Sequence, residues 1–259
     1  MNLRSGAAIK DRMDKAMKSS RETLRKRGWF EQTDLDKLQN KTYEELLHLV
    51  DCSDPIGRTS AIHLLGLNYS DKEEFISKVL RQLCSEKCLY TKIEICNALE
   101  KGKIDAARQM IGYLGKIGNN QHKNLPLAVS QKNSYPLPRD IIARTLGRMS
   151  VVVLPLMLEV LETDDAERIS EVLDAIGYMV FYNKKLGSLK NWMHIIGVMD
   201  RFPGNQVLIW KGLMCLSAFA LDESIQRLEE VRYNDEESLL AKEARRSLKR
   251  IQKNPRRNF

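Results

Sequence analysis

The chain has 259 residues, of which 43% are apolar and 29% charged; these are ordinary values for a folded protein and exclude wholesale disorder. Its longest strongly apolar stretch, residues 151–158, is too short to cross a bilayer, so we expect no membrane partner. Residues 1–18 mix charged and small residues without the apolar run of a secretory signal, and we therefore expect a cytoplasmic protein.

The net charge of +8 is concentrated at the two ends of the chain. Residues 1–30 contain nine Lys and Arg against three acids, and residues 242–257 contain eight against one. The remaining residues hold 25 basic and 30 acidic side chains. A groove that binds nucleic acid along the middle of the chain would need a basic stripe there. The charge distribution therefore favours a protein partner and leaves the basic termini as the route to nucleic acid.

The predicted elements begin with a basic N-terminal helix or arm over residues 1–30, whose narrow apolar stripe ends near Gly28. A helical repeat domain is expected over residues 31–252, followed by a basic tail over residues 253–259. Thr42 is the predicted N-cap of the first helix of the repeat region.

The helices of the repeat domain are expected to alternate between an outer and an inner row. The outer helices are predicted at residues 43–50, 72–84, 105–117, 151–162, 188–200 and 222–231. The inner helices are predicted at residues 56–67, 88–101, 138–149, 165–182, 206–219 and 236–252. The inner helices share a phrase of small and apolar residues, and its last apolar positions recur at intervals of 34, 47, 30, 40 and 32 residues. Such intervals are typical of stacked helical repeats, each of which buries its apolar face only against its neighbours.

Four segments resemble short HEAT repeats of the kind named after phycobilisome lyases. They are residues 54–66 (DPIGRTSAIHLLG), 140–147 (DIIARTLG), 165–168 (DAER) and 241–248 (AKEARRSL). The resemblance covers residues 43–252 and implies an all-α fold, a right-handed α–α superhelix (a HEAT/ARM-like solenoid) of about six helical hairpins. In such repeats an acid and a basic residue four positions later commonly link adjacent units, and only Asp54 with Arg58 shows that pair here. No residue of this chain can be matched to a bilin pocket.

Residues 119–137 lengthen one repeat interval to 47 residues. An insertion in a repeat protein lies on one face and often carries function. A long surface loop is also tolerated because the entropy of loop closure grows slowly with length. Both interpretations of this loop stay open.

The sequence contains no recognisable catalytic motif. It lacks a Gly-rich phosphate loop, a metalloprotease helix and a nucleophile elbow. The five cysteines are expected to be reduced, and the pair Cys84 and Cys88 lacks two further zinc ligands at suitable spacing. We therefore expect a protein that is not an enzyme, with no metal, no cofactor and no small-molecule substrate.

One enzyme class shares this architecture, the HEAT-like alkylpurine DNA glycosylases. Members of that class hold DNA in a basic concave groove, with tryptophans and an acid at the lesion. The corresponding candidates here are Trp210, Asp140 and Asp174, with Arg139, Arg144 and Arg148 as basic contacts. Trp210 lies at core spacing between apolar neighbours, so packing explains it more simply.

The sequence thus predicts a non-catalytic scaffold that binds a macromolecule, foremost a protein, on the concave face of its inner helices. The expected contacts are Arg58, Lys92, Arg139 and Arg144, with Tyr90 as an aromatic anchor. The alternative is a HEAT-like protein that binds nucleic acid, including one with glycosylase chemistry.

The last predicted helix has a basic face with two interpretations. Lys242, Arg246, Lys249 and Lys253 share that face, opposite Leu248. In a repeat protein, the terminal repeat exposes such a polar face to solvent and so caps the apolar core. The same face would also attract RNA, DNA or an acidic protein.

Overall fold

The computed structural model describes residues 19–132, 134–234 and 237–253. Residues 1–18 of the predicted N-terminal arm and residues 254–259 of the predicted tail therefore lie outside the described residues. Every regular element in the described part of the chain is a helix and none is a strand, which confirms the all-α class.

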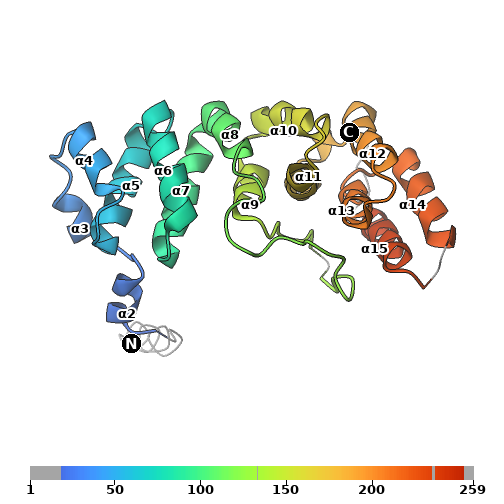
Figure 1. Ribbon diagram of the computed structural model, residues 1–259, viewed down its shortest axis with the longest axis horizontal. Coiled ribbons are helices and arrows are strands. Elements are labelled where there is room, and N and C mark those ends of the chain that lie inside the picture. Colours follow the sequence, from blue (N-terminus) through green and yellow to red (C-terminus); the bar gives the residue numbers. More distant parts are fainter. Residues whose placement is uncertain (1–18, 133, 235–236, 254–259) are drawn as a thin grey trace, which may run out of the picture.

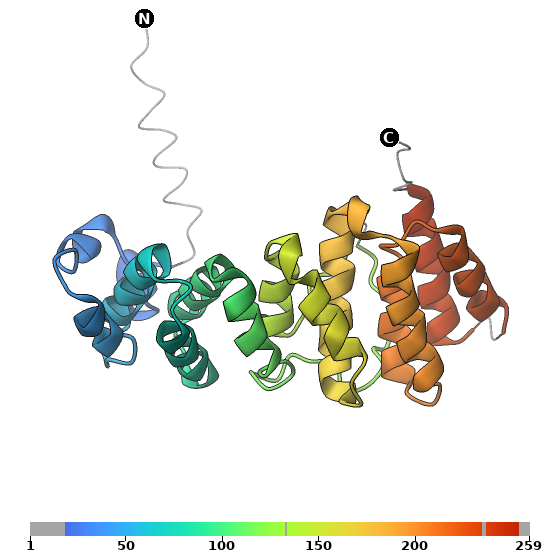
Figure 2. The same ribbon diagram turned by 90° about the horizontal axis from the view of Figure 1, so that it is seen from above.

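Most helices lie in two rows, the upper and lower rows of Figure 1. The outer row holds α4 (Tyr43–Leu49), α6 (Glu73–Ser85), α8 (Lys103–Ile111), α10 (Leu154–Leu161), α12 (Leu189–Arg201) and α14 (Asp222–Asn234). The inner row holds α5 (Pro55–Asn68), α7 (Leu89–Lys101), α9 (Ile141–Arg148), α11 (Ala166–Tyr182), α13 (Gln206–Leu216) and α15 (Leu239–Lys253). Short 3-10 helices precede α10 and α12: η1 (Val151–Val153) and η2 (Lys184–Leu186). Each outer helix packs on the inner helix that follows it, and consecutive inner helices pack on each other along the long axis (Figure 2).

Two short helices, α2 (Arg21–Lys26) and α3 (Gln32–Asp36), precede the rows and pack against α5. Between them Gly28 has a φ of +88°, and a Cβ at this position would lie 2.6 Å from the hydroxyl oxygen of Thr91 and 2.8 Å from that of Thr59. Both the left-handed backbone and the close contact require glycine here. The segment around Gly28, which leads into the two rows of helices, therefore packs closely against α5 and α7.

Side-chain caps set the starts of several helices. Thr42 and Glu45 form a capping box at the start of α4, which confirms the predicted cap. The carboxylates of Asp54, Asp140 and Asp165 accept hydrogen bonds from unpaired backbone N–H groups of α5, α9 and α11. Because this chemistry is local, the predicted starts of α5 and α11 lie within one residue of the observed ones.

Two predicted helix bounds beside the long insertion are wrong. The outer helix expected over residues 105–117 ends at Ile111, and the turns that follow contain Gly115 and Gly118, both at a φ of +75°. Glycine in this left-handed conformation ends a helix instead of continuing it. The inner helix expected from residue 138 begins only at Ile141, after the Asp140 cap.

One apolar core lies between the two rows and extends from Leu46 in α4 to Ile251 in α15. Leu65 of α5 and Leu146 of α9, two of the repeat-phrase leucines, are fully buried in it. The repeat phrase therefore marks the faces by which the helical pairs join.

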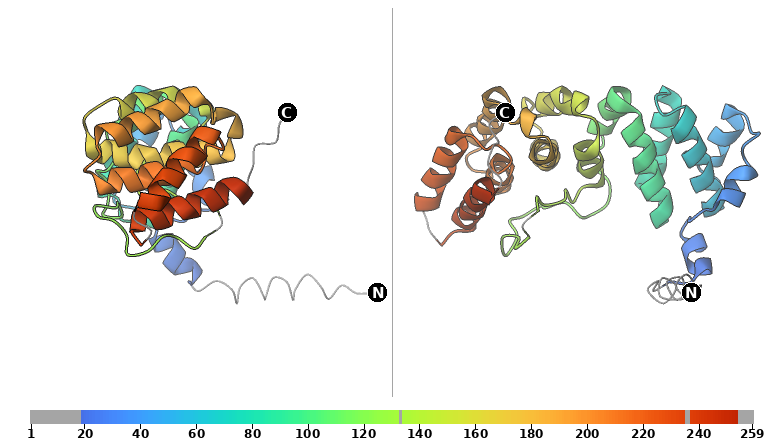
Figure 3. Two further views of the ribbon diagram at one scale, coloured as in Figure 1. Left: turned by 90° about the vertical axis from the view of Figure 1, so that its right-hand side faces the viewer. Right: turned by 180° about the vertical axis from the view of Figure 1, so that it is seen from behind.

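Residues 119–137, the crossing loop, run along the free side of the inner row (Figures 1 and 3). Near its start, the side-chain amide of Gln121 donates a hydrogen bond to Asp140 at the beginning of α9. Near its end, the carbonyl oxygen of Ser134 accepts one from Arg250 of α15. The loop thus joins helices from α9 to α15 and covers part of the inner row between them.

Candidate functional site

Arg58, predicted as a surface contact, is instead buried between helical pairs. Its Nε and Nη2 donate to the two carboxylate oxygens of Glu86 over 3.0 and 3.1 Å, and Nη1 donates to the carbonyl oxygen of Cys52 over 2.6 Å. Burial alone would raise the pKa of Glu86, but the bonds from Arg58 and from the Cys88 backbone hold that pKa below its ordinary value. Asp54 caps α5 and makes no ion pair with Arg58. Arg58 therefore joins α5 to the turn before α7 and is not free for a partner.

Tyr90 and Lys92 lie half-buried near the start of α7. The guanidinium of Arg27 lies 6.0 Å from the centre of the Tyr90 ring. Leu89 and Ile93, one helical turn apart, are 41% and 44% exposed. We call Leu89, Tyr90, Lys92 and Ile93 the α7 surface; two of the five predicted contact residues belong to it.

Arg139 and Arg144 lie where the crossing loop meets α9. Arg144 is half-buried, and its Nε donates to the carbonyl oxygen of Pro138 over 2.9 Å. Arg139 is exposed, and its Nη1 lies 3.3 Å from Nε2 of His122. Arg144 therefore holds the end of the crossing loop, whereas Arg139 keeps much of its surface open to solvent.

A buried ionic cluster lies between α11 and α13. Nζ of Lys211 lies 2.8 Å from Oε1 of Glu171 and 3.0 Å from Oδ2 of Asp174, and Asp140 is a third buried carboxylate nearby. Burial raises the pKa of Glu171 and of Asp174. Burial lowers the pKa of Lys211, but the two carboxylates outweigh it and raise that pKa. One oxygen each of Glu171 and Asp174 has no hydrogen-bond partner within the described part of the chain, where the cluster therefore holds more acceptors than donors.

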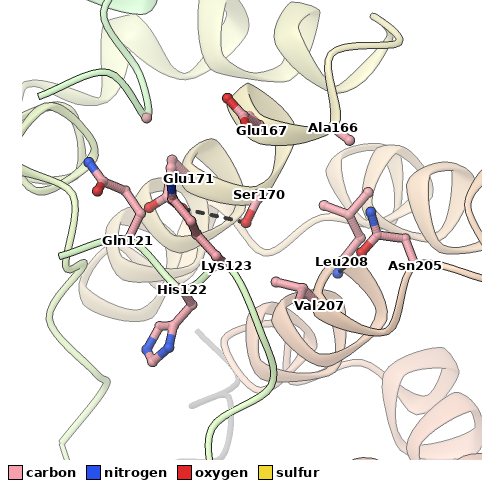
Figure 4. Close-up of a pocket in the computed structure, with 11 residues that line it drawn as sticks. Gln121, His122, Lys123, Ala166, Glu167, Ser170, Glu171, Asn205, Val207 and Leu208 are labelled. Carbon is pink, nitrogen blue, oxygen red and sulfur yellow. Dashed lines mark hydrogen bonds between the residues drawn. The ribbon is translucent and has the colours of Figure 1, made fainter. Parts of the chain in front are cut away.

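A pocket of about 230 Å³ opens beside this cluster (Figure 4). Its lining comes from the crossing loop, α11 and the start of α13, and includes Gln121, His122, Lys123, Ser170, Glu171 and Leu208. The His122 ring meets Trp210 edge-on, with ring centres 4.9 Å apart. Burial, together with the charges of Arg139 and Lys211, lowers the pKa of His122 to about 4, so its ring is neutral at pH 7. The sequence contained no signal for this pocket, because its walls come from distant segments.

Tyr135 anchors the far end of the crossing loop. It is buried, and its hydroxyl donates to the carbonyl oxygen of Met214 over 3.4 Å. The Arg250 guanidinium lies 5.4 Å from the centre of the Tyr135 ring. A Cβ at Gly177 would lie only 1.8 Å from the Tyr135 hydroxyl oxygen, so the absence of a side chain on α11 makes room for the anchor.

The Gly177→Ala variant is expected to displace Tyr135, because the added methyl group and the hydroxyl cannot occupy the same space. We expect the free energy of unfolding to fall by about 1–3 kcal/mol and limited proteolysis to cut the crossing loop faster. Gly197→Ala on α12 is the matched control, since a Cβ there meets nothing within 4 Å. Equal cleavage of the loop in both variants would contradict the anchoring role.

A larger groove, of about 650 Å³, lies between the crossing loop and α15. Residues 129–132 form the loop wall, and Phe181 of α11 also lines the groove. The opposite wall is Lys242, Arg245, Arg246, Lys249, Arg250 and Lys253 of α15. With Lys132, seven basic residues and no acidic residue are found among its described lining residues. We call this the basic groove.

Part of the basic groove was predictable from the sequence, and the rest was not. The basic face of the last helix was predicted from the sequence, but the predicted set of residues did not include Arg245 and Arg250. The loop wall was not predictable, because Ser134 and Arg250 are separated by 116 residues in sequence. The groove exists only because the crossing loop reaches α15.

Three of the residues considered for glycosylase chemistry, the tryptophan and the two acids, are buried, whereas Arg148 is exposed and pairs with Glu100. Trp210 is packed, as expected, and its Nε1 donates to Oε2 of Glu243 over 3.2 Å. Asp140 caps α9, and Asp174 belongs to the ionic cluster. Each of the three is therefore engaged with the protein itself.

Among the described residues, no group of three or more His, Cys, Asp or Glu side chains could hold a metal ion. All five cysteines are free thiols. In the part of the chain covered by the structure, no single helix is long and apolar enough to cross a membrane; one bent pair, α9 with residues 151–161, meets the length and composition of a span.

No protein-family model matches this chain, and no curated protein matches it. A solved structure of an engineered protein from the Northeast Structural Genomics Consortium aligns with 82% of this chain and 99% of its own. The two share 15% identity with a TM-score of 0.34, a likeness too weak to support an argument about fold or function.

Proposed function

We propose that this protein is a non-catalytic scaffold of the HEAT/ARM-like type, a right-handed α–α superhelix of about six hairpins that binds a protein partner at the α7 surface. The observation that carries the proposal is the exposure of Leu89 and Ile93 side by side on an inner helix. Covering such apolar area is the main favourable contribution to protein association.

The neighbours of this apolar pair suit a binding surface. Tyr90 contributes an aromatic ring, and Lys92 follows Leu89 by three residues, a spacing that makes their side chains neighbours on the helix. Because α7 packs on α5 and α9 in the common core, the surface is formed before a partner arrives, which lowers the entropy cost of binding. A cytoplasmic location belongs to this proposal, since the five free thiols suit a reducing compartment.

Site-specific photocrosslinking tests the proposal. A benzophenone amino acid in place of Ile93 is expected to give one adduct of defined mass in cells that express the protein, because the partner covers this position. The same amino acid in place of Glu159, which is exposed on outer helix α10, is expected to give none.

A second substitution gives the crosslinking experiment its control. Leu89→Glu places a charge in the proposed interface and should abolish the adduct at position 93 without changing the thermal midpoint, because Leu89 is not a core residue. An adduct that survives Leu89→Glu, or equal adducts at positions 93 and 159, would overturn the proposal.

Nucleic-acid binding is the second candidate function, and the basic groove favours it. The groove lies at α15, whereas the five residues predicted from the sequence lie elsewhere. Base excision gains no support from the buried positions of Trp210, Asp140 and Asp174.

A further inference from the structure

We infer that the basic groove binds a single strand of nucleic acid, with its phosphates along α15 and a base against Phe181 and Tyr182. The inference goes beyond the proposed scaffold function, because the basic residues of the groove are mainly on α15 and the other surface is on α7. Figure 1 shows these two helices in different parts of the fold. The two surfaces can therefore be tested independently.

Among the described residues, acidic side chains offset only part of the charge of the groove. Glu243, on the same helix, is buried and already accepts hydrogen bonds from Arg246 and Trp210. Glu237 pairs with Lys242 over 3.2 Å at the exposed end of the helix. These two acids offset only part of the positive charge of the six basic groove residues other than Lys253, so the groove attracts polyanions.

Two arginines in the groove have donors without acceptors. Nε and Nη2 of Arg245, and the same atoms of Arg246, are buried and have no hydrogen-bond partner among the residues that the structure describes. Buried donors are normally paired, and phosphate oxygens match the planar guanidinium fork. A guanidinium group can bind a phosphate through two parallel hydrogen bonds, which a lysine ammonium group cannot do.

Arg250 adds a fixed cation at the base of the groove. Its Nη1 donates to Oγ of Ser217 over 3.0 Å, and Nη2 donates to the carbonyl oxygen of Ser134 over 3.3 Å. Burial and the nearby Arg246 lower the pKa of Arg250. A bound anion would offset the repulsion between Arg246 and Arg250. Arg250 could at the same time keep its hydrogen bond to Ser134 of the crossing loop.

The spacing of the cations along α15 suits a polymer better than a single phosphate. Lys242, Arg245, Lys249 and Lys253 fall at intervals of three to four residues on one helical face. They extend over about 16 Å, whereas phosphates of a stacked strand follow one another at about 3.4 Å along its axis. Several consecutive phosphates can therefore contact the helix together.

Aromatic rings distinguish nucleic acid from other polyanions. Phe181 lines the groove, and Tyr182, 55% exposed, packs edge-on against it with ring centres 5.1 Å apart. Bases stack on such rings without regard to sequence. The crossing loop faces α15 across the groove. A single strand can turn its unpaired bases toward the rings between these walls, whereas the bases of a duplex are paired and stacked on one another.

Fluorescence anisotropy on the full chain tests the inference with labelled oligo(dT) and oligo(rU) of about 20 nucleotides. The groove variant replaces Lys242, Arg245 and Lys249 with Gln. We expect it to bind about tenfold or more weakly and to reduce the log–log salt slope by about 0.7 for each lost phosphate contact. Whichever of the two strands binds more tightly identifies DNA or RNA as the source of the phosphates.

The control variant carries the same change of charge elsewhere: Lys72→Gln, Arg108→Gln and Lys190→Gln, all exposed and on or next to outer helices. It should bind like the wild type, because both variants keep the basic termini. Equal affinities of the groove and control variants would overturn the inference, since the termini would then account for the binding. The photoadduct at position 93 should persist in the groove variant, which separates failure of this inference from failure of the proposed function.

A third variant tests the stacking of bases. Tyr182→Ala, at an exposed position, should weaken oligonucleotide binding about fivefold or more without changing the salt slope, because it removes a ring and no charge. Polyglutamate, inorganic phosphate and duplex DNA serve as competitors. Displacement of the oligonucleotide by any of these as readily as by an unlabelled single strand, or an unchanged affinity of Tyr182→Ala, would contradict single-strand binding and indicate a general anion surface.

Discussion

Lys211→Met is expected to lower the free energy of unfolding by about 3–5 kcal/mol at pH 7, because it leaves buried carboxylates without their cation. Lys211 is fully buried, with its Nζ between Glu171 and Asp174. Methionine fills a similar volume, so the loss of charge and not a cavity dominates the effect. Urea unfolding of the variant and wild type measures the difference, with the exposed Lys190→Met as control.

The loss caused by Lys211→Met is expected to shrink as the pH falls. The pKa values of Glu171 and Asp174 are already raised, and they rise further once Lys211 is gone. An acid whose pKa is raised by folding destabilises the native state at pH values above its unfolded pKa, and this penalty disappears as the pH falls below it, at about 4. Unfolding at pH 7 and near pH 4 should therefore show a smaller difference at the lower pH. A difference that is independent of pH would show that Lys211 contributes through packing alone.

Leu65→Ala is expected to cost about 2–5 kcal/mol of unfolding free energy, because it leaves a cavity in the core between α5 and its neighbours. Leu65 is fully buried, and it is the apolar residue from which the first repeat interval is counted. Leu67→Ala removes the same atoms two residues later on the same helix, where the side chain is 54% exposed. Leu67→Ala should change the unfolding free energy by less than about 0.5 kcal/mol.

Chemical unfolding followed by helical circular dichroism measures both leucine variants, and their native spectra should match that of the wild type. Similar losses from the two variants would mean that Leu67 is covered in solution, so that the exposed face of α5 is itself an interface. A silent Leu65→Ala would contradict the register of the inner helices.

Local signals made most helices predictable. The Thr42, Asp54 and Asp165 caps, with apolar residues at helical spacing behind them, place α4, α5 and α11 within one residue of their predicted starts. The apolar period also identified Leu65 and Leu146 as core residues. These features depend on residues within one or two helical turns, which sequence patterns report directly.

The candidate sites were less predictable, because a charged residue on an inner helix can face a partner or a neighbouring segment of the chain. By residue type and position on the inner helices, Arg58 and Arg144 were both expected to contact a partner. In the structure, Arg58 pairs with Glu86, and Arg144 donates a hydrogen bond to the carbonyl oxygen of Pro138. The role of each arginine depends on which segment of the chain packs against it, and the sequence pattern of the inner helices does not specify that segment. Tyr90 and Lys92 remain candidates only because nothing in the described chain covers them fully.

The sequence by itself determined the all-helical class, the order of the helices and the basic face of the last one, since each follows from periodicity, capping and local charge. Only the tertiary structure decided what that basic face becomes. The crossing loop could have lain anywhere on the surface, but Tyr135 inserts beside Gly177 and the backbone of Ser134 meets Arg250. Such contacts depend on shape complementarity between segments that are distant in sequence, so no local pattern encodes them, and they turn an exposed cationic helix into one wall of a groove.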